Sequence, residues 1–183
     1  MTIHNPRPAT VLIGLRGSGK STLGRLLAAR KQVTFVDLDD RTVASSGLPS
    51  VTAMFRAMGE PAFRAAECAA LSHALAHDVP LGAVIALGGG TPLAPGAREL
   101  LERARALGTV RIVLLDAPPK VLGARLAVAP GDRPLLVGAD FAEEAALLAE
   151  RRMPIYRALA DATVTTAAST HESLMEIERA LPA

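Results

Sequence analysis

The chain has 183 residues, of which 50% are hydrophobic and 3% aromatic, with a formal net charge of +2. This length and apolar content predict a single domain, residues 1–183, with an aliphatic core. The weak charge and the scarcity of aromatic side chains argue against a nucleic-acid partner, because such proteins use strongly basic surfaces or stacking platforms.

One cysteine, Cys68, rules out a disulfide within the chain and favours a reducing compartment. No basic-then-apolar leader opens the chain, and no apolar run reaches the length that a membrane span needs. We therefore expect a cytoplasmic protein with no membrane partner that works as a monomer on a small molecule.

Short β-branched apolar segments alternate along the chain with longer segments of helical periodicity. This alternation predicts a parallel sheet covered by helices on both faces. The Gly- and Pro-rich segment 127–140 is long for a loop of this architecture and is expected to be a mobile lid. The expected strands span 9–14, 33–39, 82–90, 109–117 and 161–166, and the expected helices span about 19–31, 50–77 (interrupted near Gly59), 95–106, 118–128, 140–159 and 170–181.

The strongest motif is "GLRGSGKST" at residues 14–22, which fits G-x-x-x-x-G-K-[ST] between a strand and a helix. Its glycines let backbone N–H groups surround an anion, and the following helix adds its positive N-terminal end. In such a loop Lys20 reaches the β- and γ-phosphates of a nucleotide, and the Ser21 hydroxyl binds Mg²⁺. A chance glycine-rich turn is the alternative. The predicted nucleotide-binding residues here are Gly17, Ser18, Gly19, Lys20, Ser21 and Thr22.

Two aspartates end the second expected strand, in "FVDLDD". Because Asp37 and Asp39 are two residues apart, a strand would present both on one face, where ligands of parallel sheets gather. One carboxylate is a candidate for holding Mg²⁺ near Ser21, and the other for taking a proton from an attacking hydroxyl. The alternative is helix capping, for which Asp40 is the better candidate.

Three glycines and three arginines complete the set of candidate residues. The triplet at 88–90 suits a ligand that approaches the backbone closely, although a plain turn is the alternative. Arg64 and Arg152 are candidates for gripping one carboxylate, and Arg133 for neutralising charge during phosphoryl transfer. Taken singly, each arginine also fits a solvated surface position, and sequence spacing does not show that they converge.

Together these residues resemble the shikimate kinase family over about residues 10–165. The resemblance rests on "GLRGSGKST", "DLD", "MFRAMGEPAFRAAE", "GGG", "RPLL" and "RRMPIY", which stand in the family's order. It implies a three-layer α/β P-loop kinase fold with a five-stranded parallel sheet in the order 2-3-1-4-5. It also implies a lid at about 127–140, a substrate-binding region at about 39–77, and transfer of a phosphoryl group from ATP to the 3-hydroxyl of shikimate.

The resemblance also implies a role for each matching residue. Ser21 and Asp37 would position Mg²⁺, while Lys20, Asp39 and Arg133 would be catalytic, with Asp39 the candidate base. Arg133 would also touch both substrates. Shikimate would be bound by Asp39, Phe55, Phe63, Arg64, Gly88, Gly89, Gly90 and Arg152.

The chain departs from the family pattern at the expected adenine contact. The family often has an arginine seven residues before its lid arginine, and here Leu126 stands at that position, so Arg125 is the nearest candidate. Two rival functions stay open. One is another small-molecule kinase of the same fold, such as a gluconate kinase, and the other is a ligand-sensing domain without turnover.

Overall fold

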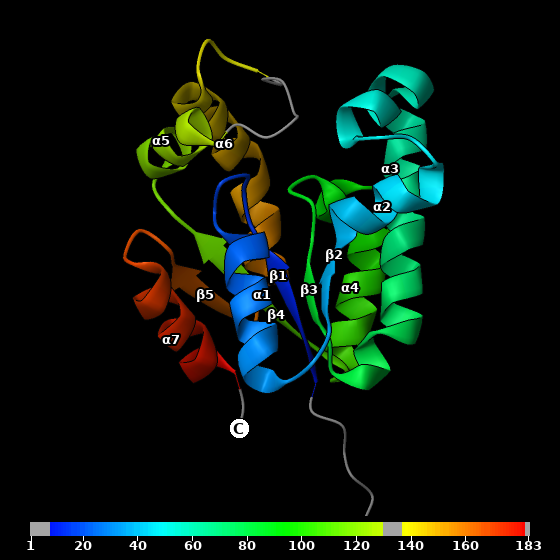
Figure 1. Ribbon diagram of the computed structural model, residues 1–183, viewed down its shortest axis with the longest axis vertical. Coiled ribbons are helices and arrows are strands. Elements are labelled where there is room, and N and C mark those ends of the chain that lie inside the picture. Colours follow the sequence, from blue (N-terminus) through cyan, green and yellow to red (C-terminus); the bar gives the residue numbers. More distant parts are fainter. Residues whose placement is uncertain (1–7, 130–136, 182–183) are drawn as a thin grey trace, which may run out of the picture.

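The computed structural model describes residues 8–129 and 137–181 of the chain. The strands are β1 (Ala9–Ile13), β2 (Phe35–Asp37), β3 (Val84–Ala86), β4 (Val110–Asp116) and β5 (Ala162–Thr165) (Figure 1). The α-helices are α1 (Lys20–Lys31), α2 (Leu38–Ser46), α3 (Val51–His77), α4 (Ala97–Ala106), α5 (Pro119–Val128), α6 (Phe141–Leu159) and α7 (Thr170–Ala180). Two short 3₁₀ helices, η1 (Val79–Leu81) and η2 (Thr91–Leu93), flank β3.

The five strands form one parallel sheet in the order β2-β3-β1-β4-β5, which confirms the expected topology. In the central strand, Val11 lies opposite Ile85 of β3 on one side and Ile112 of β4 on the other. Most strands are shorter than expected at both ends, and the residues that follow their carboxyl ends belong to the turns that build the site.

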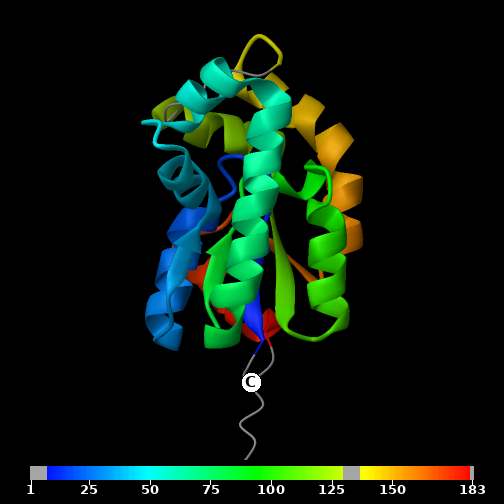
Figure 2. The ribbon, with the colours of Figure 1, turned by 90° about the vertical axis from the view of Figure 1, so that its right-hand side faces the viewer.

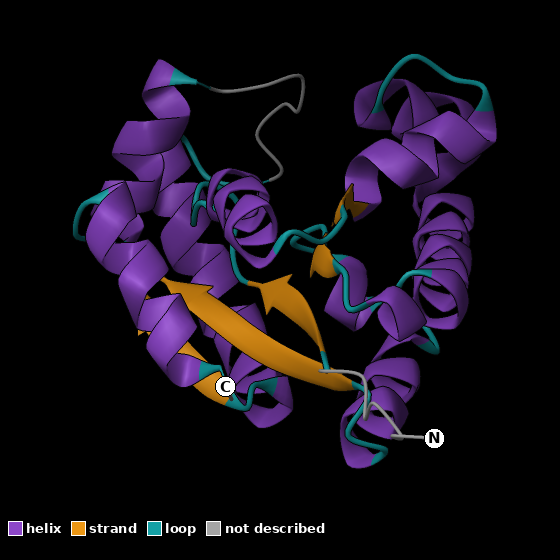
Figure 3. Cartoon of the chain, turned by 60° about the horizontal axis from the view of Figure 1, so that its bottom comes forward, coloured by secondary structure: helices purple, strands orange, loops and turns teal. Residues whose placement is uncertain are grey.

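Side chains of β1 alternate between two apolar layers, as the pleat of a strand requires. Val11 and Ile13 pack with residues of α3, α4 and α6, whereas Leu12 packs with residues of α1 and α7. The sheet is therefore covered on both faces (Figures 2 and 3). The continuous apolar runs of the sequence are explained by this two-sided burial.

The turn after β2 corrects one expectation. The strand ends at Asp37, whose side chain accepts the N–H of Asp39 at 3.2 Å and so caps α2, a helix that the sequence analysis did not foresee. Asp39 thus lies in the first turn of a helix and not on a strand. The capping role expected of Asp40 belongs to Asp37, and Asp40 is exposed beside Arg25 at 3.8 Å. An aspartate followed by acidic residues in the first turn is a typical helix start.

The long helix α3 is broken at Gly59, as expected, because that residue has φ 75° and ψ 168°. Only glycine adopts this backbone conformation readily. The break folds the first part of α3 over a small apolar cluster that contains Val51, Met54 and Phe63. In Figure 1, α2 and the start of α3 stand on one side of the upper end of the molecule, and α5 and α6 stand on the other.

The expected lid at 127–140 is only partly described. Helix α5 includes the first two residues of this segment, and α6 begins directly after its last residue, while Arg133 lies outside the described residues.

None of the described helices is both long enough and apolar enough to cross a bilayer.

Candidate active site

The loop between β1 and α1 has the form that the glycine-rich motif predicts. Helix α1 begins at Lys20, and its N-cap residue Gly19 has φ 91°, a value that favours glycine. The Lys20 ammonium donates hydrogen bonds to the carbonyl oxygens of Gly14 and Leu15, each at 2.9 Å. The cation is therefore held over the loop whose N–H groups and helix end are suited to a phosphate.

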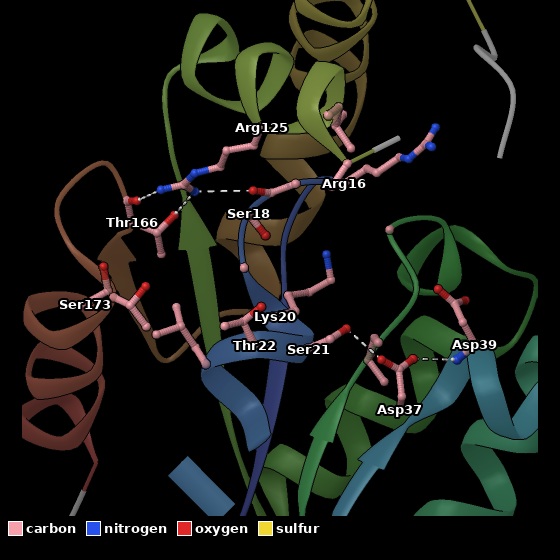
Figure 4. A pocket seen from close by; sticks show the side chains of 18 of the residues that line it. Arg16, Ser18, Lys20, Ser21, Thr22, Asp37, Asp39, Arg125, Thr166 and Ser173 are labelled. Atoms are coloured by element: carbon pink, nitrogen blue, oxygen red, sulfur yellow. Dashed lines mark hydrogen bonds between the residues drawn. The ribbon is translucent and has the colours of Figure 1, made fainter. Parts of the chain in front are cut away.

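Ser21 and Asp37 form an oxygen pair beside this loop. The Ser21 hydroxyl donates to Asp37 Oδ2 at 2.6 Å, and the other oxygen of the same carboxylate caps α2 (Figure 4). Mg²⁺ in phosphate sites takes one or two protein oxygens and completes its shell with phosphate and water. A hydroxyl and a carboxylate beside a phosphate loop fit that requirement.

A pocket of about 470 Å³ runs along the loop that follows β1 and reaches the carboxyl ends of β2, β3 and β5. At one end it is lined by Asp37, the last residue of β2, by Asp39 two residues later, and by Gly89, which follows β3. At the other end it is lined by Arg125 of α5 and by Thr166, which follows β5 (Figure 4). The pocket thus reaches from the predicted acceptor residues to the predicted nucleotide residues.

The glycine triplet after β3 lets charged side chains lie against the backbone. A Cβ on Gly88 would overlap Asp39 Oδ1 and would lie 2.9 Å from Glu67 Oε1. A Cβ on Gly90 would lie 2.7 Å from Cζ of Arg64. Close approach to a carboxylate and a guanidinium, beyond the needs of a turn, explains why these two positions are glycine.

The middle glycine connects the triplet to α6. The carbonyl oxygen of Gly89 accepts hydrogen bonds from Arg152 Nη1 at 3.0 Å and from the Tyr156 hydroxyl. Burial raises the pKa of Tyr156, so its hydroxyl stays protonated and able to donate. Arg64 and Arg152 therefore lie against consecutive residues of one loop, which the spacing of the sequence could not show.

Glu67 is a site residue to which the sequence analysis gave no role. It is 1% exposed, accepts from Arg64 Nη1 at 2.6 Å and from the Thr91 hydroxyl at 2.7 Å, and lies beside Gly88. Burial raises its pKa, and Arg64 and Thr91 oppose that rise. Burial alone would lower the pKa of Arg64, but the carboxylates of Glu67 and Glu60 raise it. The i,i+3 spacing of Arg64 and Glu67 on a helix was the available signal.

The two predicted phenylalanines contact this arginine. The rings of Phe55 and Phe63 lie 4.4 Å apart between centroids, and Arg64 Cζ lies 5.7 Å and 5.5 Å from those centroids. Phe63 is buried in the cluster beneath the break in α3, while Phe55 is half-buried. Both rings therefore help to hold the Arg64 guanidinium in place.

Arg125 lies at the end of the pocket that the sequence analysis predicts to bind the nucleotide. Its guanidinium donates to the carbonyl oxygen of Gly17 at 3.3 Å and to both the hydroxyl (3.4 Å) and the carbonyl oxygen of Thr166. Leu126, at the position where the family often has arginine, packs against Gly17 instead. Arg125 thus joins the phosphate loop to the segment between β5 and α7.

Comparisons with known proteins show the family of this chain. The profile of the family described as shikimate kinase matches residues 16–182. A shikimate kinase of Thermobifida fusca is 40% identical over 179 residues, which cover 97% of this chain and 96% of that protein. This chain belongs to the shikimate kinase family. Shikimate kinase from Acinetobacter baumannii, solved in complex with shikimate, superposes with a TM-score of 0.83 at 27% identity and covers 94% of this chain and 92% of that one.

A gluconokinase from Sinorhizobium meliloti superposes with a TM-score of 0.57 at 18% identity, covering 95% of this chain and 91% of that one. This likeness extends to the fold alone.

Within this member of the shikimate kinase family, the pocket brings together the predicted residues from Gly17 to Thr22 with Asp37, Asp39, Gly89 and Arg125. Gly88, Gly90, Arg64 and Arg152 lie directly beside it, next to Asp39 and Gly89.

Proposed function

We propose that this chain transfers the γ-phosphoryl group of ATP to the 3-hydroxyl of shikimate, giving ADP and shikimate 3-phosphate. The observation that carries the proposal is the position of Gly89. It lines the same pocket as Lys20 and Asp39, and its carbonyl oxygen binds Arg152. A phosphate-binding loop therefore opens onto the Asp39 carboxylate, with the guanidinium groups of Arg64 and Arg152 beside it, which suits a hydroxylated carboxylic acid.

The acceptor's carboxylate would be bound by Arg64 and Arg152. Arg64 is bonded to buried Glu67 and, at 3.1 Å, to Glu60, whose side chain is 64% exposed. An incoming carboxylate would replace the exposed Glu60, while Glu67 keeps the guanidinium oriented. Hydrogen bonds to charged groups contribute roughly 1.5–3 kcal/mol each, so two arginines provide strong selection for an acid.

The transfer step would use Asp39 as the base. Asp39 takes the proton of the 3-hydroxyl as its oxygen attacks the γ-phosphorus, and ADP leaves with the electron pair of the broken P–O bond. Lys20 and Arg133 would stabilise the charge on the transferring group. Ser21 and Asp37 would hold Mg²⁺, which neutralises phosphate charge when it is bound.

The proposal extends to the nucleotide and to the setting of the protein. Arg125, which joins Gly17 to Thr166, would contact the nucleotide beyond its phosphates. The free, half-buried thiol of Cys68 suits a reducing compartment such as the cytoplasm, and we keep a monomer as the expected state.

Coupled ADP release tests the function directly. We expect rapid ADP formation with shikimate and little with gluconate, a nucleoside monophosphate or no acceptor. Faster turnover of gluconate would support the gluconate-kinase alternative, and shikimate binding without turnover would support a sensor.

Asp39→Asn should lower kcat about 100-fold or more, since general bases contribute roughly 10²–10⁴-fold to the rate. Near-normal turnover by this variant would exclude Asp39 as the base.

A further inference from the structure

Arg16 is a residue of the phosphate loop that the proposed reaction does not use. Its guanidinium lies 4.0 Å from Glu144 Oε2 and 5.6 Å from the ring centroid of Phe141, and both residues belong to the first turn of α6. The Glu144 side chain is 2% exposed and that of Arg16 is 19% exposed. In Figure 4, Arg16 points toward the side of the pocket where Asp39 lies, away from Arg125.

The first turn of α6 is firmly placed. Asp140 caps it by accepting the N–H groups of Ala142 and Glu143, each at 2.8 Å. Helix α5 approaches so closely that a Cβ on Gly123 would lie 2.7 Å from Cα of Ala142. Glu144 therefore offers Arg16 a fixed anchor rather than a mobile surface carboxylate.

The same helix carries a predicted acceptor-binding residue. Arg152 follows Glu144 by eight residues, which is about 12 Å along a helix axis. At that end α6 binds the Gly89 carbonyl oxygen, and a Cβ on Gly89 would lie 3.7 Å from the backbone nitrogen of Arg16. Helix α6 and the phosphate loop thus meet at two places, at Glu144 and near Gly89.

We propose that Arg16 and Glu144 form a positioning pair that fixes the phosphate loop against α6 and so keeps the bound nucleotide in register with Arg152. This inference rests on the proposed function, because it concerns the alignment of the two substrates. Loss of Arg16 removes a counter-charge from buried Glu144, and loss of Glu144 removes one from half-buried Arg16. Either loss would let the phosphate loop shift relative to α6. A displacement of about 1 Å between reacting groups can lower the rate about 100-fold.

A double-mutant cycle tests the pair with Arg16→Met, Glu144→Gln and the combined variant. We expect each single variant to lower kcat about tenfold and the combined variant to be no slower than either, because both remove one interaction. KM for ATP and for shikimate should change less than about threefold, since the loss occurs when both substrates are aligned. Arg16→Lys should recover most of kcat by keeping the charge. The exposed pair Arg98–Glu102 on α4, 2.8 Å apart, is the matched control, and Arg98→Met should leave kcat unchanged.

Two outcomes would overturn the pair. One is multiplication of the two single effects to about 100-fold in the combined variant, which would mean independent roles. The other is a loss confined to Arg16→Met, which would mean that Arg16 contacts a substrate directly. Calorimetric binding of ADP and a melting curve for each variant separate misalignment from unfolding. The wild-type rate with shikimate tests the proposed function by itself, and the variant ratios, measured with whichever acceptor the wild type uses, test the pair.

Discussion

Gly89 and Gly90 are neighbours in the glycine triplet that follows β3, yet they leave very different room for a side chain. A Cβ on Gly89 would find its nearest atom, Arg152 Nη1, at 3.5 Å, whereas a Cβ on Gly90 would collide with the Arg64 guanidinium. Gly90→Ala should therefore displace Arg64 and raise KM for shikimate about tenfold or more, because charge-assisted bonds of roughly 1.5–3 kcal/mol are lost. KM for ATP should stay close to the wild-type value.

Gly89→Ala is the matched comparison for that variant, since it adds the same methyl group one residue earlier. Steady-state kinetics with each substrate varied in turn should show that Gly89→Ala raises KM for shikimate less than Gly90→Ala does. Equal effects of the two substitutions would mean that contact with Arg64 does not decide why this loop is glycine.

Glu67 should make stability depend on pH. Its pKa is raised above 4.5 by burial, so the native state binds more protons than the unfolded state between the two pKa values. The stability that Glu67 gains from binding a proton in the native state is complete at pH values below its pKa in the unfolded chain. This stability is lost as the pH rises through the pKa of Glu67 in the folded protein. Urea denaturation between about pH 4 and 7 should show Glu67→Gln gaining stability relative to the wild type as the pH rises. A constant or falling difference would mean that the pKa of Glu67 is not raised.

At the scale of elements, the break in α3 sets the positions of residues that we propose bind shikimate. Gly59 has a backbone conformation that is essentially restricted to glycine. Among the described residues, a Cβ there would have one neighbour within 4 Å, Pro61 Cδ at 3.9 Å. Gly59→Ala should therefore cost about 1–3 kcal/mol of unfolding free energy through strain alone. It should also raise KM for shikimate, because Phe55 lies before the break and Arg64 after it.

Thermal and urea denaturation measure the first effect, and initial rates with shikimate varied measure the second. Gly108→Ala is a suitable control, since Gly108 also has a positive φ (69°) but follows α4. That variant should lose stability without a change in KM for shikimate. If Gly59→Ala were as stable as the wild type, α3 could run straight through the break.

The sequence predicted most elements because the apolar patterns and glycine breaks are local signals. The break at Gly59 was visible in this way, whereas α2 was missed because "FVDLDD" reads equally well as one strand. The roles of Glu67 and Tyr156 depend on contacts with Thr91 and Gly89, which are far away along the chain. Spacing within a helix can suggest such partners but cannot show which loop they meet.

At the scale of the whole molecule, the order of the strands assembles the site. Because β3 lies between β2 and β1, the turn that carries Asp39, the glycine triplet and the phosphate loop follow three adjacent strands. Helix α6, which packs on the same face of the sheet as α3 and α4, then brings Arg152 to the triplet. The resemblance to a family supplied this order, since an alternating pattern of strands and helices is compatible with several parallel arrangements.

The central claim is that a phosphoryl group passes from the loop at Lys20 to a hydroxyl held beside Asp39. The most direct measurement is phosphorus NMR of the reaction of ATP and shikimate with the enzyme, with coupling to protons used to locate the ester. We predict one new phosphomonoester signal, coupled to the proton on the carbon that bears the 3-hydroxyl, together with ADP. Release of inorganic phosphate alone, or an ester at another hydroxyl, would contradict the proposed arrangement of donor loop and acceptor site.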